Sequence, residues 1–168
     1  MKNIGVLIVE TNGLDPKDSD ILQILLTGAP GYLNTFAPYK KFEWDSALNG
    51  LMPEALVSFS VFSQEDADEL TKLIAGYDKI LVYNGDFIYN FLTYNGVGIL
   101  PGVLEDVMVL YSEKFENDSY EKRLKAMADY GITDTGKGIY SKALSIRELY
   151  VKLTAKPKKR TTEGRDGP

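Results

Sequence analysis

The stretch Leu7-Ile8-Val9-Glu10-Thr11-Asn12-Gly13-Leu14 closes an apolar run that begins at Asn3. Val and Ile dominate this run, which is typical of a strand buried on both faces at the centre of a sheet. Glu10 is the only acidic residue of the run, and it stands where the strand gives way to a turn at 13–16. This carboxylate at the end of a buried strand is therefore the first candidate site residue of the chain.

The rest of the chain contains further apolar strands, followed mainly by amphipathic helices. Ile21 to Leu26 fits either a strand or a short helix, because periodicity cannot separate the two in so short a run. Ser63 is a typical N-cap for a helix that ends before Gly76. The order of the elements indicates one α/β domain at 1–155. The other predicted elements are strands at 39–45 and 78–83, short helical turns at 46–51 and 53–57, and helices at 87–93, 104–115, 119–130 and 141–154.

The composition excludes several kinds of chemistry. The 168 residues are 44% hydrophobic and 26% charged, which suits a globular domain with a substantial core. The chain contains no Cys and no His, so disulfides, thiolate metal sites and Ser-His-Asp or Cys-His mechanisms are ruled out within it. No apolar run approaches the roughly 20 residues that span a bilayer, and no signal peptide is recognisable. We expect a cytoplasmic protein without a membrane partner.

The net charge of −5 is unevenly distributed along the chain. The segment 156–168 holds five basic and two acidic residues and is expected to be a disordered basic tail, with solubility as its simplest role. The remaining body has 14 basic and 22 acidic residues, a net charge of −8. Such a body repels DNA phosphate and attracts basic surfaces, so we expect no direct DNA binding.

Two groups of acidic residues stand out in this body. The usual explanation of such groups is a solvated helix face. They could also form a negative patch that resembles DNA phosphate to a basic partner. The candidate partner-binding residues are Glu65, Asp66, Asp68 and Glu69 in the first group, and Glu113, Glu116 and Asp118 in the second.

Three segments of the chain follow one another in a set order. After Leu7 to Leu14 come Leu81-Val82-Tyr83-Asn84-Gly85-Asp86-Phe87-Ile88 and then Tyr140-Ser141-Lys142-Ala143-Leu144-Ser145-Ile146. With the stretches 49–54 and 104–110 between them, this series resembles the DEDD-type 3′–5′ exonucleases, the family of the proofreading subunit of bacterial replicative polymerases. The resemblance extends from Asn3 to Thr154. It implies a ribonuclease H-like exonuclease fold, an α/β fold with a mixed central sheet flanked by helices.

The chain departs from this family where the family binds metal. The family motifs have the forms Asp-x-Glu-Thr-x-Gly-Leu, Asn-x-x-Phe-Asp and His-x-Ala-x-x-Asp. Glu10 matches one of the four acids, whereas Ile8, Ile88 and Ile146 stand at the positions of the other three, and Ser141 replaces the His. Two-metal nucleolysis needs clustered carboxylates, so the resemblance implies a scaffold without its metal site. We expect no catalytic residue, no metal and no cofactor, and we expect Glu10 to be a vestige that meets solvent or a nearby Lys.

Two other acids keep an alternative hypothesis open. A shifted alignment would bring Asp86 or Glu148 to the missing ligand positions. Asp86 is expected to be the N-cap of the helix that follows it, and the position of Glu148 on the last helix leaves its role open. The alternative function is therefore a divergent metal-dependent 3′–5′ exonuclease.

A dead exonuclease scaffold is expected to act by binding. In length and character the chain is similar to phage-encoded inhibitors of the bacterial DNA sliding clamp, which implies a host-takeover protein that blocks loading of the clamp onto DNA. An acidic protein could occupy the basic channel of a clamp, whose two-fold ring favours a homodimeric partner. The nearest match to a clamp-binding peptide, Gln23-Ile24-Leu25-Leu26, is predicted to be a core strand. A homodimeric structural protein without replication partners is the third hypothesis.

Overall fold

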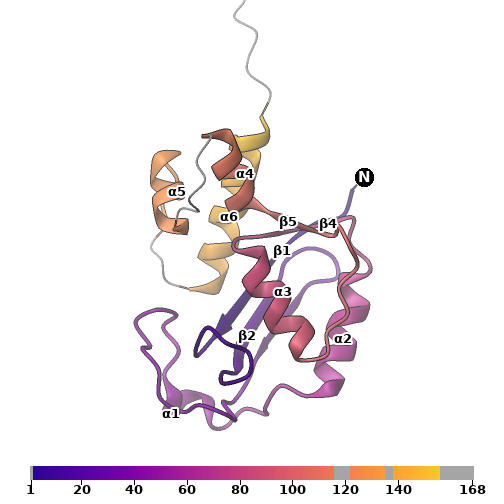
Figure 1. The fold of residues 1–168 in the computed structure, drawn as a ribbon, viewed down its shortest axis with the longest axis vertical. Helices are drawn as coiled ribbons and strands as arrows, with labels where there is room; N and C mark the ends of the chain where they lie inside the picture. Colours follow the sequence, from indigo (N-terminus) through magenta and orange to yellow (C-terminus); the bar gives the residue numbers. More distant parts are fainter. Residues whose placement is uncertain (1, 116–121, 135–137, 156–168) are drawn as a thin grey trace, which may run out of the picture.

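The computed structural model describes residues 2–115, 122–134 and 138–155, and these form a mixed sheet with helices on both faces (Figure 1). The sheet has the strand order β3-β2-β1-β4-β5. The strand β1 pairs antiparallel with β2 and parallel with β4, which in turn pairs parallel with β5. The strands are β1 (Ile4–Thr11), β2 (Ile21–Leu26), β3 (Tyr32–Thr35), β4 (Lys79–Val82) and β5 (Leu104–Asp106).

The helices lie mainly after β3, as the order of patterns in the sequence predicts. A short first helix precedes α2, and α3 joins the two parallel strands β4 and β5. The bounds are α1 (Pro53–Leu56), α2 (Gln64–Ile74), α3 (Gly85–Tyr94), α4 (Val107–Lys114), α5 (Arg123–Asp129) and α6 (Ile139–Thr154).

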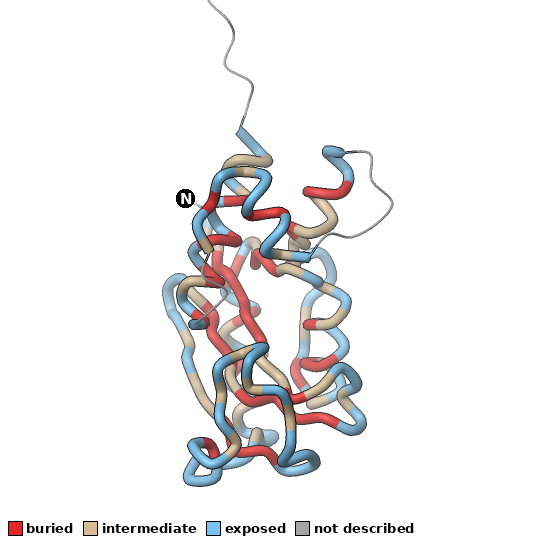
Figure 2. The backbone as a smooth tube through the Cα atoms, turned by 90° about the vertical axis from the view of Figure 1, so that its left-hand side faces the viewer, coloured by how far each residue is buried: buried red, intermediate tan, exposed pale blue. Residues whose placement is uncertain are grey.

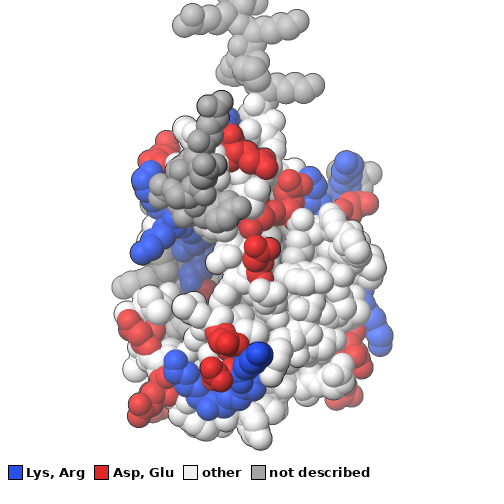
Figure 3. Space-filling view, viewed as in Figure 1, with Lys and Arg blue, Asp and Glu red and all other residues white. Residues whose placement is uncertain are grey.

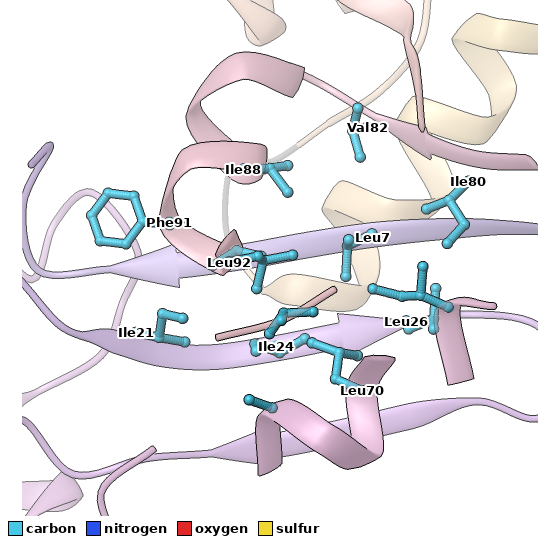
Figure 4. Packing of buried hydrophobic residues seen from close by; sticks show 14 of the residues in the cluster. Leu7, Ile21, Ile24, Leu26, Leu70, Ile80, Val82, Ile88, Phe91 and Leu92 are labelled. Carbon is cyan, nitrogen blue, oxygen red and sulfur yellow. The ribbon is translucent and has the colours of Figure 1, made fainter. Parts of the chain in front are cut away.

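The central strand β1 contributes alternate side chains to two hydrophobic cores, because successive residues of a strand point to opposite faces of the sheet. Leu7 and Val9 belong to the core that α2 and α3 cover, and Val6 and Ile8 to the core that α4, α5 and α6 cover. Figure 4 shows the first core, where Leu7 meets side chains from β2, α2 and α3. In Figure 2 a long run of buried residues (red) passes through the middle of the molecule, and exposed residues (pale blue) are common in the surrounding loops.

Side chains fix the beginnings of three helices. Ser63 and Asp66 form a capping box at α2, which confirms the N-cap predicted from the sequence. The Asp106 carboxylate accepts hydrogen bonds from the backbone N–H groups of Gly85 (2.5 Å) and Met108 (2.9 Å). Asp106 therefore holds the first turns of both α3 and α4.

The structure corrects three predicted elements. The strand predicted at 39–45 is wrong: the backbone amides of Lys40 and Lys41 donate to the Asp20 carboxylate at 2.8 and 3.0 Å instead of joining the sheet, and the third strand is β3. The helix predicted at 104–115 is a strand followed by a helix. The N-cap predicted at Asp86 is wrong, because Asn84 caps α3 in the left-handed region at a φ of 67°.

Three further expectations concern membrane-spanning helices, the basic tail and the peptide-like segment. Among the described residues, no helix is long and apolar enough to cross a membrane. The predicted basic tail at 156–168 lies outside the described residues, as do Glu116 and Asp118. The peptide-like segment Gln23-Ile24-Leu25-Leu26 lies in β2 with its three apolar side chains buried, which confirms that it is a core strand.

Candidate functional site

A cavity of about 480 Å³ opens at the carboxyl ends of the parallel strands β1 and β4. Ligands of open α/β sheets bind at such strand ends. The wall of this cavity combines residues of β1, the loop before α1, the β4–α3 junction, α5 and α6. Its lining residues are Leu7, Ile8, Val9, Glu10, Ala47, Leu48, Tyr83, Asn84, Phe87, Ile88, Arg123, Leu124, Lys142 and Ile146.

The three motif segments converge on this cavity. Ile8 and Glu10 lie two residues apart and share one face of β1. Ile88 comes from the first half of α3, and Ile146 from α6, which packs against β1. All three isoleucines are buried, with Ile88 in one core and Ile8 and Ile146 in the other, so they extend both cores up to the cavity wall.

Three other residues from the sequence analysis do not join the cavity lining. Asp86 is exposed on the first turn of α3. Glu148 is exposed on α6, where its carboxylate lies 3.1 Å from the ammonium of Lys152 one turn away. Ser141 is half-buried. The shifted alignment therefore brings neither Asp86 nor Glu148 to Glu10.

Glu10 forms an ion pair with Lys142, a residue that lies 132 positions further along the chain. The ammonium group donates directly to Glu10 Oε1, and the two side chains are only 13% and 11% exposed for Glu10 and Lys142, respectively. The expectation that Glu10 meets a nearby Lys is therefore confirmed. Lys142 lies within the third motif segment without matching a family residue, and it stands four residues before Ile146 and so on the same face of the helix.

A second buried ion pair involves Arg123, another residue of the cavity lining. Arg123 Nη1 bonds to the carboxylate of Asp134, whose side chain is 1% exposed. Ser145 Oγ donates to the same carboxylate at 2.5 Å and accepts from Arg123 Nη1 at 3.3 Å. Burial lowers the pKa of Arg123, whereas Glu10 and Tyr83 act to raise it. The sequence gives no local signal for this cluster, because its members lie far apart along the chain.

The residues of this site do not fit a divalent metal ion. Among the described residues, no group of three or more His, Cys, Asp or Glu side chains comes close enough to hold a metal. The one carboxylate in the cavity lining already has an ammonium partner, and the guanidinium of Arg123 adds a second positive charge. Mg²⁺ requires several hard oxygen ligands, and the isoleucine side chains offer only hydrocarbon.

A smaller cavity of about 380 Å³ adjoins the first and shares Val9, Glu10, Leu48 and Phe87 with it. Its outer wall is the loop between β3 and α1. The buried Asn12 side chain donates to the Lys41 carbonyl at 2.5 Å and anchors one part of this loop. Asn49 donates to the Thr11 carbonyl at 3.1 Å and anchors another part. These amide contacts hold the loop against the end of β1.

The candidate acidic residues do not form one continuous patch. Glu65, Asp66, Asp68 and Glu69 all belong to α2, and Glu113 lies on α4, away from α2 along the long axis of the molecule (Figure 1). Asp66 is engaged in the capping box, and Asp68 accepts from Gln64 at 2.9 Å. On the face drawn in Figure 3, acidic and basic side chains are interspersed. The side chains of Glu65 and Glu69 are exposed on this helix.

Comparisons with known proteins find similarity in structure alone. No protein-family model and no curated protein sequence matches the chain. Exonuclease X in complex with 5′-overhanging duplex DNA has a TM-score of 0.63 and 11% identity, over 89% of this chain and 90% of that one. Brucella melitensis NrnC with bound Mg²⁺ has a TM-score of 0.55 and 12% identity, over 91% of this chain and 72% of the NrnC chain. A product-bound exonuclease I has a TM-score of 0.62 and 16% identity, over 90% of this chain and 44% of the exonuclease I chain.

The structural neighbours are DEDD-type exonucleases, and they define the class of fold. The mixed five-stranded sheet with helices on both faces is a ribonuclease H-like α/β exonuclease fold, as the sequence predicts.

Removing either partner of the Glu10–Lys142 pair should destabilise the protein. We expect Lys142→Met to lower the free energy of unfolding by about 3 kcal/mol, because it leaves the Glu10 carboxylate, only 13% exposed, without its ammonium partner. Glu10→Gln should also destabilise, and the double variant should recover most of the loss. Urea unfolding followed by circular dichroism measures all three variants.

Glu148→Gln is the matched control for this cycle. Glu148 pairs with Lys152 on the same helix, but its side chain is 52% exposed, and such exposed pairs contribute less than about 1 kcal/mol. Additive effects in the double variant would show that Glu10 and Lys142 are not energetically coupled.

Proposed function

We propose that this protein is a catalytically inactive member of the exonuclease-like structural class that acts by binding a replication protein. The observation that carries this proposal is the pairing of Glu10 with Lys142 in a cavity lined by Ile8, Ile88 and Ile146. In the motif comparison, these isoleucines occupy the positions of the family acids. A lysine ammonium and three hydrocarbon side chains cannot clamp the attacking and leaving oxygens of a phosphodiester as two metal ions do.

The proposed partner is the bacterial DNA sliding clamp, with the protein blocking its loading onto DNA as a phage-encoded inhibitor in the host cytoplasm. The body of the chain carries a net charge of −8, and Glu65 and Glu69 present exposed carboxylates on one helix. A basic channel built for DNA phosphate would attract such a surface. Since β2 buries Ile24, Leu25 and Leu26, the proposed binding relies on surface charge rather than on a clamp-binding peptide.

The alternative function is a divergent metal-dependent 3′–5′ exonuclease. The fold shared with exonuclease X, NrnC and exonuclease I favours it. In that case Glu10 would have to release Lys142 and act with ligands that do not lie beside it in the described structure.

The first experiment separates these two functions. With Mg²⁺ or Mn²⁺, we expect no shortening of a 5′-labelled single-stranded DNA on a sequencing gel, because the site lacks a ligand set for two metals. Glu10→Gln is the control for contaminating nucleases, since their cleavage would be unchanged by it. Metal-dependent cleavage that disappears in Glu10→Gln would establish the exonuclease and refute inactivity.

The second experiment tests the partner. The purified protein should co-elute with purified bacterial sliding clamp, and about 1 M KCl should weaken the complex because salt screens exposed charge pairs. Glu65→Lys combined with Glu69→Lys should abolish co-elution. Glu43→Lys combined with Glu54→Lys changes the net charge equally at exposed positions outside α2 and should have little effect. Failure of the unaltered protein to co-elute would refute clamp binding.

A homodimer is also part of the proposal, because the partner is a two-fold ring and symmetric binders match symmetric targets. Light scattering coupled to size exclusion should give twice the mass of the 18.7 kDa chain. A monomeric mass across the measured concentration range would refute the homodimer, while leaving clamp binding to be judged by co-elution.

A further inference from the structure

We infer that the cavity at the end of β1 binds a small ligand that has an apolar body and a single carboxylate. This inference concerns a different part of the molecule from the acidic surface of α2. The cavity volume of about 480 Å³ lies in the range of small-ligand sites, which is roughly 300–1,000 Å³. Its combination of an apolar wall with a few fixed polar groups is also typical of such sites.

The charges that line this cavity have the opposite balance from the rest of the chain. Glu10, Arg123 and Lys142 are the charged residues of its lining, two positive and one negative. Asp134 is not part of the lining, because its carboxylate is buried against Arg123. The lining therefore presents two cations and one carboxylate to a ligand, while the fourth charge of the cluster, Asp134, lies outside the lining.

Lys142 and Arg123 each have N–H groups that their ion pairs do not use, and these groups could donate to a ligand carboxylate. A lysine ammonium has three N–H donors, and Lys142 directs one of them to Glu10. A guanidinium has five, and the bonds of Arg123 to Asp134 and Ser145 both come from Nη1. Within the described part of the chain, the Nε and Nη2 hydrogens of Arg123 have no hydrogen-bond acceptor. Hydrogen bonds between these cationic groups and a carboxylate are stronger than those between neutral groups.

The apolar wall of the cavity favours a ligand whose part beyond the carboxylate is apolar. Ile8, Phe87 and Ile88 contribute hydrocarbon and aromatic surface beside the charges. Leu124 stands half-exposed in the same lining, so an apolar group can reach the cavity past it. A dianionic phosphate monoester would leave excess negative charge against this wall, which disfavours it relative to a monocarboxylate.

The test uses 4-phenylbutyrate as a probe and the single tryptophan of the chain as a reporter. Trp44 lines the adjoining smaller cavity, so its fluorescence should respond to occupancy. We expect saturable binding of 4-phenylbutyrate and at least about tenfold weaker binding of the neutral 4-phenylbutanamide. An acetylated tripeptide ending in phenylalanine, with a free or an amidated carboxyl end, distinguishes a peptide terminus from a small metabolite as the source of the carboxylate.

Two charge-changing variants are expected to alter the affinity for the probe in opposite directions. Lys142→Met should weaken binding about tenfold by removing a cation, whereas Glu10→Gln should strengthen it by removing the competing carboxylate. Leu124→Asp should weaken binding through like-charge repulsion. Leu144→Asp is the matched control, because Leu144 is 70% exposed on α6 and lies outside the cavity lining. Melting curves verify that each variant is folded.

Several results would overturn the inference. Equal binding of the acid and the amide would show that the cavity does not recognise charge. Tighter binding of thymidine monophosphate than of 4-phenylbutyrate would assign the site to phosphate, and unchanged or weaker binding in a folded Glu10→Gln variant would contradict the charge argument. Because none of these measurements involves the clamp, their outcome is independent of co-elution.

Discussion

The structure depends on the burial of one strand between two layers of helices. Because β1 lies at the centre of the sheet, its alternate side chains must fill two different cores, with Leu7 and Val9 on one face and Val6 and Ile8 on the other. The same alternation places Glu10 on the face of Ile8, toward α6. A charge at that position is largely removed from water, so a partner from the covering helix stabilises it, and Lys142 supplies that partner.

That partner changes what the scaffold can offer to a ligand. In a site designed for divalent metals, carboxylates create a negative field that cations neutralise from solution. Here the neutralising charge is covalently part of α6, and Arg123 places a second one nearby. The charges that act inside the cavity in the described structure are therefore those of Lys142 and Arg123 beside Glu10.

The sequence predicted the architecture better than the interactions within the site. The Val- and Ile-rich run ending at Glu10, the capping signal at Ser63 and the order of motifs were sufficient for the fold. The segment 39–45 was misassigned because Asp20, a side chain about 20 residues away, takes the hydrogen bonds of its backbone. The cluster of Arg123, Asp134 and Ser145 could not be predicted, since no local pattern records which distant charges will be buried together.

Asp106 links the edge of the sheet to the wall of the cavity. Its carboxylate sits at the end of β5 and holds the first turns of α3 and α4 at once. Phe87 and Ile88 stand on the first turns of α3, so the Asp106 carboxylate adds a side-chain link between the cavity wall and the edge strand to the backbone pairing of β4 with β5. One carboxylate thus serves the sheet edge, two helix starts and the support of the wall that Phe87 and Ile88 form.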